Sequence, residues 1–289
     1  MSYKPVEVVD LAGTAGCYKG NLGTPNFLVR SFMAGLLIAV GAALCTVCGT
    51  GLDKTLGPGF KSLIGGAVFP VGLIAIVLTG MSLFTGDTML IPMAVFQKKS
   101  TWNKVFKAWF WVYIGNFVGS LFWAYLMVVG PLSVGGGPDL TPFGQNAIGI
   151  AEAKTLPYIA GGSMGLWSAF MKGIGCNLLV NLAILLAFSS KAMIGKFFGI
   201  WFPIMAFVAT GFEHCVANMY FLPAGKFLTD WYPAVIAKKG GLLLANGGLS
   251  WGDIWFWNLI PATIGNIFGG FLFIGVTYFL MFRNDLPKE

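Results

Sequence analysis

His214 is the only histidine in the chain, and it follows Glu213 within the apolar stretch 197–222. Ionisable side chains at membrane depth are costly unless they face water or a partner, and they often mark a substrate or proton path. An imidazole can also exchange a proton near neutral pH. We therefore predict a pore role for His214. The alternative is a structural histidine that binds carbonyl groups freed by a break in the helix.

A second candidate, Thr85, lies in another long apolar segment. Its hydroxyl could satisfy freed backbone groups or bind a permeating oxyanion, and the sequence leaves both roles open. Asp87 nearby is expected to cap the half-helix that follows. Asn116, Asn177 and Asn266 are polar groups inside apolar spans, and for Asn116 we expect an interhelical hydrogen bond.

Enzymatic and metal chemistry have no support in the sequence. One histidine and scattered thiols cannot supply the convergent set of ligands that zinc requires. Cys45 and Cys48 have the spacing of a redox motif, but they lie within an apolar span and are expected to pack there. The chain shows no phosphate-binding glycine loop after a strand, no Gly-x-Ser-x-Gly motif and no nucleic-acid motif. We expect no cofactor, no enzymatic activity and no nucleic-acid partner.

The composition excludes a large soluble domain. The 289 residues are 56% hydrophobic and only 10% charged, with a net charge of +7, whereas soluble domains carry about 25% charged residues. A helical membrane span needs ~20 residues. The chain has six apolar segments on this scale, and they predict an all-α polytopic membrane protein. The sixth segment contains residues 265–269, and the first five cover 32–48, 62–97, 109–129, 173–188 and 197–222.

The second and fifth segments are too long for one straight helix, so each is expected to consist of two half-helices around a break. The residues placed to break the second segment are Pro70, Gly80, Gly86 and Pro92. Gly-Asn-Phe-Val-Gly at 115–119 recurs as Gly-Asn-Ile-Phe-Gly at 265–269, which indicates a 3+3 internal repeat. Three spans in each half require the halves to be inverted, and paired interrupted helices indicate a substrate path near the bilayer centre.

The basic residues predict cytoplasmic termini, because Lys and Arg are more frequent at the span ends on that side. We expect one membrane transport domain, 1–289, made of a cytoplasmic segment 1–26, six spans within 27–282 and a cytoplasmic tail 283–289. Other expected features are an interfacial helix at 5–19, outer connections at 130–149 and 223–248, and a re-entrant segment at 156–171.

Four sequence runs together resemble the formate/nitrite transporter family, and they extend over nearly the whole chain. They are Phe-Pro-Val-Gly-Leu at 69–73, Leu-Phe-Thr-Gly-Asp at 83–87, Gly-Phe-Glu-His-Cys-Val-Ala-Asn-Met at 211–219 and Ile-Pro-Ala-Thr-Ile-Gly-Asn-Ile-Phe-Gly-Gly at 260–270. The resemblance implies an aquaporin-like fold of six spans with interrupted second and fifth helices. It also implies a homopentamer in the cell membrane, with a separate pore through each protomer.

The resemblance implies a pore with two hydrophobic constrictions. His214 matches a histidine between them. Phe69 and Phe207 match the outer constriction, and Leu73 and Leu83 match the inner one.

Polar residues complete the implied site. Thr85 matches the threonine of the loop that interrupts the second helix, while Asn177 and Asn266 match pore-facing asparagines. Lys154 matches a lysine buried near the outer vestibule. Its spacing to Asn177 is several residues longer than in the best-known formate channel, so an ordinary loop lysine is the alternative. Glu213 and Asn218 belong to the same motif as His214.

A bare anion in a narrow apolar pore would lose hydration worth many kcal/mol. We therefore predict that Lys154 draws formate into the vestibule, that formate crosses as the neutral acid, and that His214 relays the proton. The motifs do not separate formate from nitrite or hydrosulfide as the main substrate. A water or glycerol channel should carry paired Asn-Pro-Ala motifs, which this chain lacks. A membrane-embedded enzyme or sensor is a third class.

Overall fold

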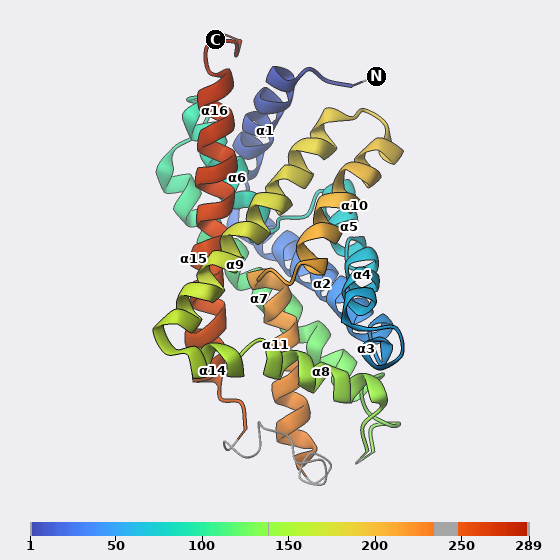
Figure 1. Cartoon of the computed structure of the whole chain (residues 1–289). Helices are drawn as coiled ribbons and strands as arrows, with labels where there is room; N and C mark the ends of the chain where they lie inside the picture. Colours follow the sequence, from blue (N-terminus) through green and yellow to red (C-terminus); the bar gives the residue numbers. More distant parts are fainter. Residues whose placement is uncertain (1, 138, 234–247, 288–289) are drawn as a thin grey trace.

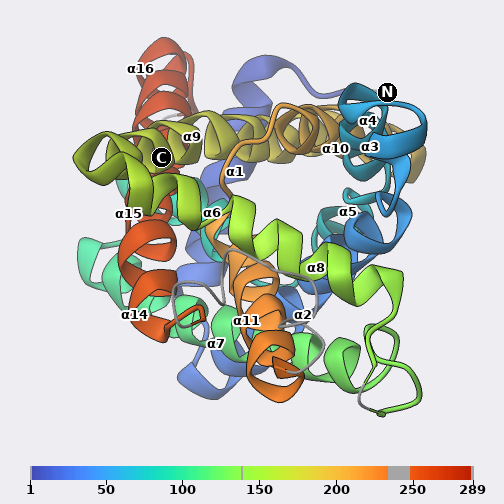
Figure 2. The ribbon, with the colours of Figure 1, turned by 60° about the horizontal axis from the view of Figure 1, so that its bottom comes forward.

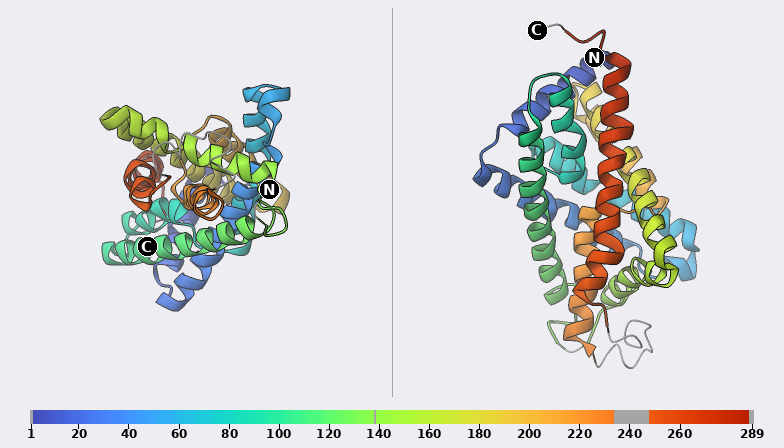
Figure 3. Two further views of the ribbon diagram at one scale, coloured as in Figure 1. Left: turned by 90° about the horizontal axis from the view of Figure 1, so that it is seen from below. Right: turned by 90° about the vertical axis from the view of Figure 1, so that its left-hand side faces the viewer.

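The computed structural model describes residues 2–137, 139–233 and 248–287. Within these ranges the chain is helical, apart from turns, loops and two isolated bridges that join Ser2 to Ser190 and Ser133 to Leu140. Both termini lie at one end of the helical bundle, which we call the terminal end (Figures 1 and 3). An even number of membrane crossings requires this arrangement.

The first half of the chain begins with a surface helix and continues into three spans. Its helices are α1 (Pro5–Gly20), α2 (Thr24–Cys48), α3 (Leu52–Thr55), α4 (Pro58–Val68), α5 (Val71–Thr79), α6 (Phe84–Phe96) and α7 (Trp102–Val129).

The second half repeats the three spans. Its elements are α8 (Pro142–Ala153), α9 (Leu156–Ser189), α10 (Met193–Ala209), α11 (Cys215–Trp231), α14 (Trp251–Ile254), η1 (Trp255–Leu259), α15 (Ile260–Ile267), η2 (Phe268–Val276) and α16 (Thr277–Phe282). The elements from α14 to α16 form one continuous rod along the bundle, with π-helical turns at η1 and η2 (Figure 1). The helix α8 lies across the bundle beside α11 (Figure 2).

Five helical stretches of the described chain are long and apolar enough to cross a membrane. They are Thr24–Thr55, Pro58–Phe96, Trp102–Val129, Pro142–Ser189 and Trp251–Phe282. The fifth span in chain order consists of α10 and α11, which have 17 residues each. The expected six segments are therefore present.

Several predicted boundaries were wrong. The first span begins at Thr24 and the third at Trp102, because polar and charged residues at these ends continue the helix beyond the apolar stretch. The expected re-entrant segment 156–171 is instead the first part of α9, which bends at Gly162 with φ 54° and ψ −128°. A glycine adopts this conformation without a Cβ clash. The part of the segment that follows Gly162 therefore belongs to the same helix as the predicted fourth span, and the part before it is a short helical stretch across the bend.

The predicted outer connections are shorter than expected. Helix α8 begins at Pro142 within the stretch 130–149, and α11 extends to Trp231 within the stretch 223–248. Residues 234–247, which include Lys238 and Lys239, and residues 288–289 at the end of the expected tail lie outside the described part of the chain.

The second and fifth spans break in the same way. Gly80 ends α5 and Gly211 follows α10, both with the left-handed φ that glycine tolerates, 75° and 73°. Three residues after each glycine, Leu83 and His214 take extended conformations and act as the N-caps of α6 and α11. The expected breaks in both spans are present.

Two residues expected to break the second span do not. Gly86 and Pro92 lie inside α6. Pro223 occupies the corresponding place inside α11, nine residues after the N-cap in each case (92 − 83 and 223 − 214). A proline here removes one helical hydrogen bond without ending the helix.

Close helix pairs position the breaks. Helix α2 packs along α7, and α9 packs along α15. A Cβ atom on Gly119 would collide with the carbonyl oxygen of Phe32, and one on Gly269 would collide with that of Ile174. The recurring glycines therefore hold one helix against its neighbour in each half, as small residues do in membrane proteins.

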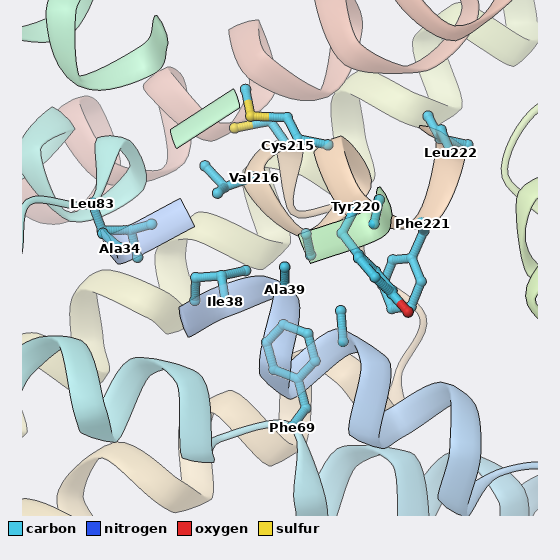
Figure 4. Packing of buried hydrophobic residues seen from close by; sticks show 14 of the residues in the cluster. Ala34, Ile38, Ala39, Phe69, Leu83, Cys215, Val216, Tyr220, Phe221 and Leu222 are labelled. Atoms are coloured by element: carbon cyan, nitrogen blue, oxygen red, sulfur yellow. The ribbon is translucent and has the colours of Figure 1, made fainter. Parts of the chain in front are cut away.

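The packed centre brings both halves together. Figure 4 shows α2 residues between side chains of the second span and side chains of α11. The labelled residues are Ala34, Ile38, Ala39, Phe69, Leu83, Cys215, Val216, Tyr220, Phe221 and Leu222.

Candidate functional site

The two half-helices that follow the breaks, α6 and α11, meet with their N-terminal ends. His214 is the N-cap of α11, and Thr85 lies in the first turn of α6. The hydroxyl Oγ1 of Thr85 is 3.0 Å from Nε2 of His214. Helix N-termini carry partial positive charge, so this junction favours an anion.

The second ring nitrogen of His214 fixes the position of its proton. The backbone N–H of Ala217 donates to Nδ1 of His214 at 3.0 Å, which is the N-cap bond of α11. A nitrogen that accepts a hydrogen bond carries no proton, so the neutral ring has its proton on Nε2. Nε2–H therefore donates to Oγ1 of Thr85, and the hydroxyl hydrogen of Thr85 stays available for another acceptor.

Two asparagines hold the two breaks in the same manner. In the first half, Oδ1 of Asn116 accepts from the backbone N–H of Phe84 at 2.8 Å. Its Nδ2 donates to the carbonyl oxygens of Ser31 and Ser82, at 2.7 and 3.1 Å. The interhelical hydrogen bond expected for Asn116 is therefore present.

Asn266 does the same in the second half. Its Oδ1 accepts from the backbone N–H of Cys215 at 2.9 Å, and its Nδ2 donates to the carbonyl oxygens of Gly173 and Glu213. Phe84 and Cys215 each follow an N-cap, so the two asparagines satisfy equivalent backbone groups freed by the breaks.

The asparagines expected to face the pore form hydrogen bonds with other groups of the protein instead. Asn177 and Asn266 are fully buried. Nδ2 of Asn177 donates to the carbonyl oxygen of Thr85, to Oγ1 of Thr88 and to the carbonyl oxygen of Asn266. In this structure both residues support the backbone around Thr85 and His214, and neither lines the cavities described next.

A cavity of about 210 Å³ lies on the side away from the termini, which we call the outer cavity. Phe69, Phe207 and His214 line it. The rings of Phe69 and Phe207 meet edge to face at 5.6 Å, and the ring of Phe207 stacks on His214 at 5.7 Å. The expected outer constriction residues therefore contact each other and the histidine.

A second cavity of about 190 Å³, the inner cavity, lies toward the terminal end. Leu73 and Leu83 line it together with the cationic residues Lys19 and Arg30. The expected inner constriction residues thus separate this cavity from Thr85.

The centre between the two cavities is dry in this conformation. The side chains concerned are no more than 3% exposed. They are Phe69, Leu73, Leu83, Thr85, Phe207 and His214. Hydrophobic constrictions of this kind close a pore by excluding water.

Glu213 anchors a polar network beside the histidine. Its Oε2 lies 2.8 Å from Nζ of Lys154, and the Glu213 side chain is only 3% exposed. The hydroxyl of Tyr158 donates to Oε1 at 2.7 Å, and Nδ2 of Asn218 donates to Oε2 at 2.6 Å. A buried carboxylate needs such partners to remain charged. Lys154 also lines the outer cavity, so it is not an ordinary loop lysine.

Sequence reasoning missed three members of this network. Nδ2 of Asn258 donates to the carbonyl oxygen of Lys154 at 2.9 Å, and Oδ1 of Asn258 accepts from Asn218. Nζ of Lys172 donates to the hydroxyl of Tyr158 at 3.2 Å. The available signal was the same for Asn258 and Tyr158, a polar group within an apolar stretch. Lys172 lies inside α9, and its charge within this helix was a further signal.

The capping role expected for Asp87 was wrong. The N-cap of α6 is Leu83, and Asp87 follows it by four residues, which places its carboxylate beyond the free N–H groups. Oδ1 of Asp87 instead forms a buried ion pair with Nζ of Lys19 at 2.5 Å. This pair ties α1 to α6.

Metal binding and disulfides find no support within the described residues. They contain no group of three or more His, Cys, Asp or Glu side chains that could hold a metal ion. Cys45 and Cys48 are free thiols, and Cys45 packs against the hydrophobic core.

The comparisons with known proteins agree with this geometry. Residues 6–280 match the family model described as formate/nitrite transporter. A "Probable formate transporter" of Methanothermobacter thermautotrophicus is 39% identical, with 89% of each chain covered. A formate channel of Bacillus thuringiensis is 36% identical, with 98% of this chain and 97% of the relative covered.

The solved structures agree as well. A pentameric formate channel with formate bound superposes with a TM-score of 0.75 at 29% identity, covering 90% of this chain and 98% of the other. The aquaporin-like fold expected from the sequence is thereby confirmed, and the chain is a multi-pass membrane protein.

Proposed function

The chain belongs to the formate/nitrite transporter family, whose members are channels and transporters rather than enzymes, and we propose that it passes formate and related small weak-acid anions across the cell membrane. The observation that carries this proposal is the pairing of Thr85 with His214 between two cavities. The names of the relatives, which are formate transporters and channels, favour formate within this class.

The cavities suit the approach of an anion. Lys154 lines the outer cavity beside its partner Glu213, and Lys19, the partner of Asp87, lines the inner one. Arg30 also lines the inner cavity, and its hydrogen-bond partners are uncharged. Cations in a water-filled vestibule raise the local concentration of anions. Both cavities end at apolar side chains, where a bare anion would lose its hydration at a cost that these distant charges do not offset. The substrate therefore crosses the centre as the neutral acid.

Each proton that reaches formate at the centre comes from His214 and is replaced from the side of uptake. The Nε2–H bond of a doubly protonated His214 breaks, and an O–H bond forms on a formate oxygen. The hydroxyl of Thr85 donates a hydrogen bond to the other formate oxygen. Formic acid crosses the inner constriction and releases its proton to water on that side, while Nε2 regains a proton from the side of uptake. One proton accompanies each formate, so transport is electroneutral.

The histidine relay has a structural condition. Double protonation of the ring requires a proton on Nδ1, which now accepts from the N–H of Ala217. The N-cap bond of α11 must therefore break in the relay form. Such a bond stabilises a helix by about 0.5–2 kcal/mol, which is small beside the cost of desolvating an anion.

Uptake into sealed proteoliposomes tests this proposal. Formate, nitrite, hydrosulfide, lactate and acetate are compared at two external pH values, with membrane current recorded in parallel. We expect uptake of formate that increases as the external pH falls and that carries no net current. A steady current of one negative charge per formate would contradict the neutral-acid mechanism. Faster uptake of nitrite or hydrosulfide than of formate would assign a different main substrate and leave the neutral-acid mechanism in place.

We further propose that the protein is a homopentamer with both termini in the cytoplasm. The matched pentameric formate channel supports the assembly, and the excess of basic residues near the terminal end supports the orientation. Light scattering in mild detergent should give five protomers per particle, and a monomer would contradict the assembly. A thiol-reactive label applied from outside cells should not reach a cysteine introduced in place of Ser2.

A further inference from the structure

A pocket of about 400 Å³ opens at the terminal end, apart from both pore cavities. The end of α6, the end of α16 and α1 surround it. We call it the terminal pocket. Its lining combines the cationic residues Lys98, Lys99 and Arg283 with apolar residues that include Phe96 and Phe279. Such a lining suits a ligand with an anionic group and an apolar part.

The charges of the terminal pocket do not cancel. Nζ of Lys99 lies 2.6 Å from Oδ1 of Asp10, and it also donates to Gln97. Asp10 is the acidic residue of the pocket lining, and its charge is neutralised because it is paired with Lys99. Lys98 and Arg283 are exposed, and neither side chain has a hydrogen bond or ion pair within the described part of the chain. Among the described residues, the pocket thus presents two free cations.

The backbone of Lys98 is unusual. Among the described residues it is the one non-glycine residue with a positive φ, 61°. Its N–H donates to the carbonyl oxygen of Val95, and the N–H of Lys99 donates to that of Ala94, a left-handed ending of α6 that normally uses glycine. A lysine is strained there, and strain of this kind often accompanies a functional side chain.

The aromatic residues beside the pocket mark the depth of the membrane surface. The ring of Phe96 lies 5.3 Å from that of Phe279 and 5.9 Å from that of Trp102. Trp102 begins the third span and is 41% exposed. Tryptophan at the end of a span is typical of the lipid headgroup region. The two free cations therefore lie where phosphate groups of lipids are found.

We propose that the terminal pocket binds the headgroup of an anionic phospholipid. The phosphate lies between Lys98 and Arg283, and the first part of an acyl chain follows Phe96 and Phe279. The apolar lining distinguishes this ligand from free phosphate, which has no apolar part. Basic pockets at the cytoplasmic ends of spans are known places for anionic headgroups. The inference does not depend on the transported substrate.

Lipid binding by the purified pentamer or protomer tests the proposal. Delipidated protein in an uncharged detergent is titrated with phosphatidylglycerol, phosphatidylcholine or inorganic phosphate, and lipid adducts are counted by native mass spectrometry. The test variants are Lys98→Gly and Lys98→Gly combined with Arg283→Gln. Lys107→Gln is the matched control, because Lys107 is an exposed lysine of α7 that does not line the pocket.

The wild-type protein should bind phosphatidylglycerol more tightly than phosphatidylcholine. Each cation near an anionic headgroup contributes about a fivefold gain in affinity, so the double variant should bind phosphatidylglycerol about thirtyfold more weakly. Lys98→Gly should lose lipid affinity while its thermal midpoint rises, because glycine relieves the strained conformation. A purely structural lysine would not give these opposite effects.

Two results would overturn the proposal. One is equal phosphatidylglycerol binding by the double variant and Lys107→Gln. The other is wild-type affinity for inorganic phosphate as high as that for phosphatidylglycerol, which would assign the pocket to a soluble anion.

Discussion

Replacing His214 by asparagine separates the proposed proton relay from the support of the helix break. In the wild type, Nδ1 of His214 accepts from the N–H of Ala217, and Nε2–H donates to Thr85. Asparagine is among the best N-cap residues, and its Oδ1 can accept the bond from Ala217. An amide does not take up a proton at physiological pH. His214→Asn therefore retains the cap and removes the relay.

The stability cost of this change should be small. The variant keeps the N-cap bond, which is worth about 0.5–2 kcal/mol. It loses the hydrogen bond from Nε2–H to Thr85, worth about 0.5–1.5 kcal/mol. It also loses the ring contact between His214 and Phe207, at 5.7 Å, and aromatic pairs contribute about 0.5–1.5 kcal/mol. His214→Ala loses the N-cap bond as well and is the matched destabilised control. We expect normal assembly for the asparagine variant and a lower thermal midpoint for the alanine variant.

The effect on transport should be large. Proton transfer by a positioned side chain contributes about 10²–10⁴-fold in rate, so proton-linked formate uptake by His214→Asn should fall by about that factor. Wild-type uptake should increase as the external pH falls, because protons accompany formate inward. The variant should lose this dependence, and any residual formate flux should carry current. Uptake into proteoliposomes and membrane current measure both properties.

One result would refute the reasoning. If His214→Asn assembles normally and takes up formate with the wild-type rate and pH profile, the histidine only supports the break of the fifth span. The N-cap bond to Ala217 would then be its whole role.

Three further predictions concern the rest of the site. Phe69→Ala or Phe207→Ala should increase lactate uptake relative to formate, because the width of an apolar constriction sets its selectivity; unchanged lactate-to-formate ratios in both variants would remove these rings from the pore. Lys154→Gln should destabilise the protein by about 3–5 kcal/mol, because it leaves the Glu213 carboxylate buried without a cation, and adding Glu213→Gln should restore much of the thermal midpoint. Asn266→Ala should lower the free energy of unfolding by about 3 kcal/mol through the loss of three hydrogen bonds. A thermal midpoint equal to that of the wild type would contradict the role of Asn266 in holding the break of the fifth span.

The elements that sequence predicted well are those with a local signal. His214 and Thr85 stood out because ionisable and hydroxyl groups are rare in long apolar segments, and the structure brings them within 3.0 Å. The breaks were predicted because the second and fifth apolar segments are too long for one straight helix, and the structure places them at Gly80 and Gly211, which have a positive φ. The composition of the chain was sufficient for the membrane assignment.

The features that were missed depend on contacts between distant segments. Lys19 and Asp87 are 68 residues apart in sequence and form an ion pair. A charge count treats Lys19 only as a topological signal. The continuity of α9 was missed because the charged Lys172 lies between the expected re-entrant segment 156–171 and the expected span 173–188, yet the helix continues through it and bends at Gly162 instead. Whether a glycine ends or bends a helix depends on what the following residues pack against.

The inverted halves explain how the fold brings one polar pair of side chains together at its centre. The N-caps of α6 and α11 occupy equivalent places, each three residues after a left-handed glycine and each followed by a backbone N–H held by an asparagine. One N-cap is Leu83, which lines the inner cavity, and the other is His214. Two residues further along, α6 has Thr85 where α11 has Val216, so each half supplies one polar and one apolar side chain. Because the half-helices meet by their N-termini, the polar pair becomes adjacent without any change in the repeated backbone. The repeat thus provides the geometry, and the side chains that differ between the two halves place Thr85 beside His214.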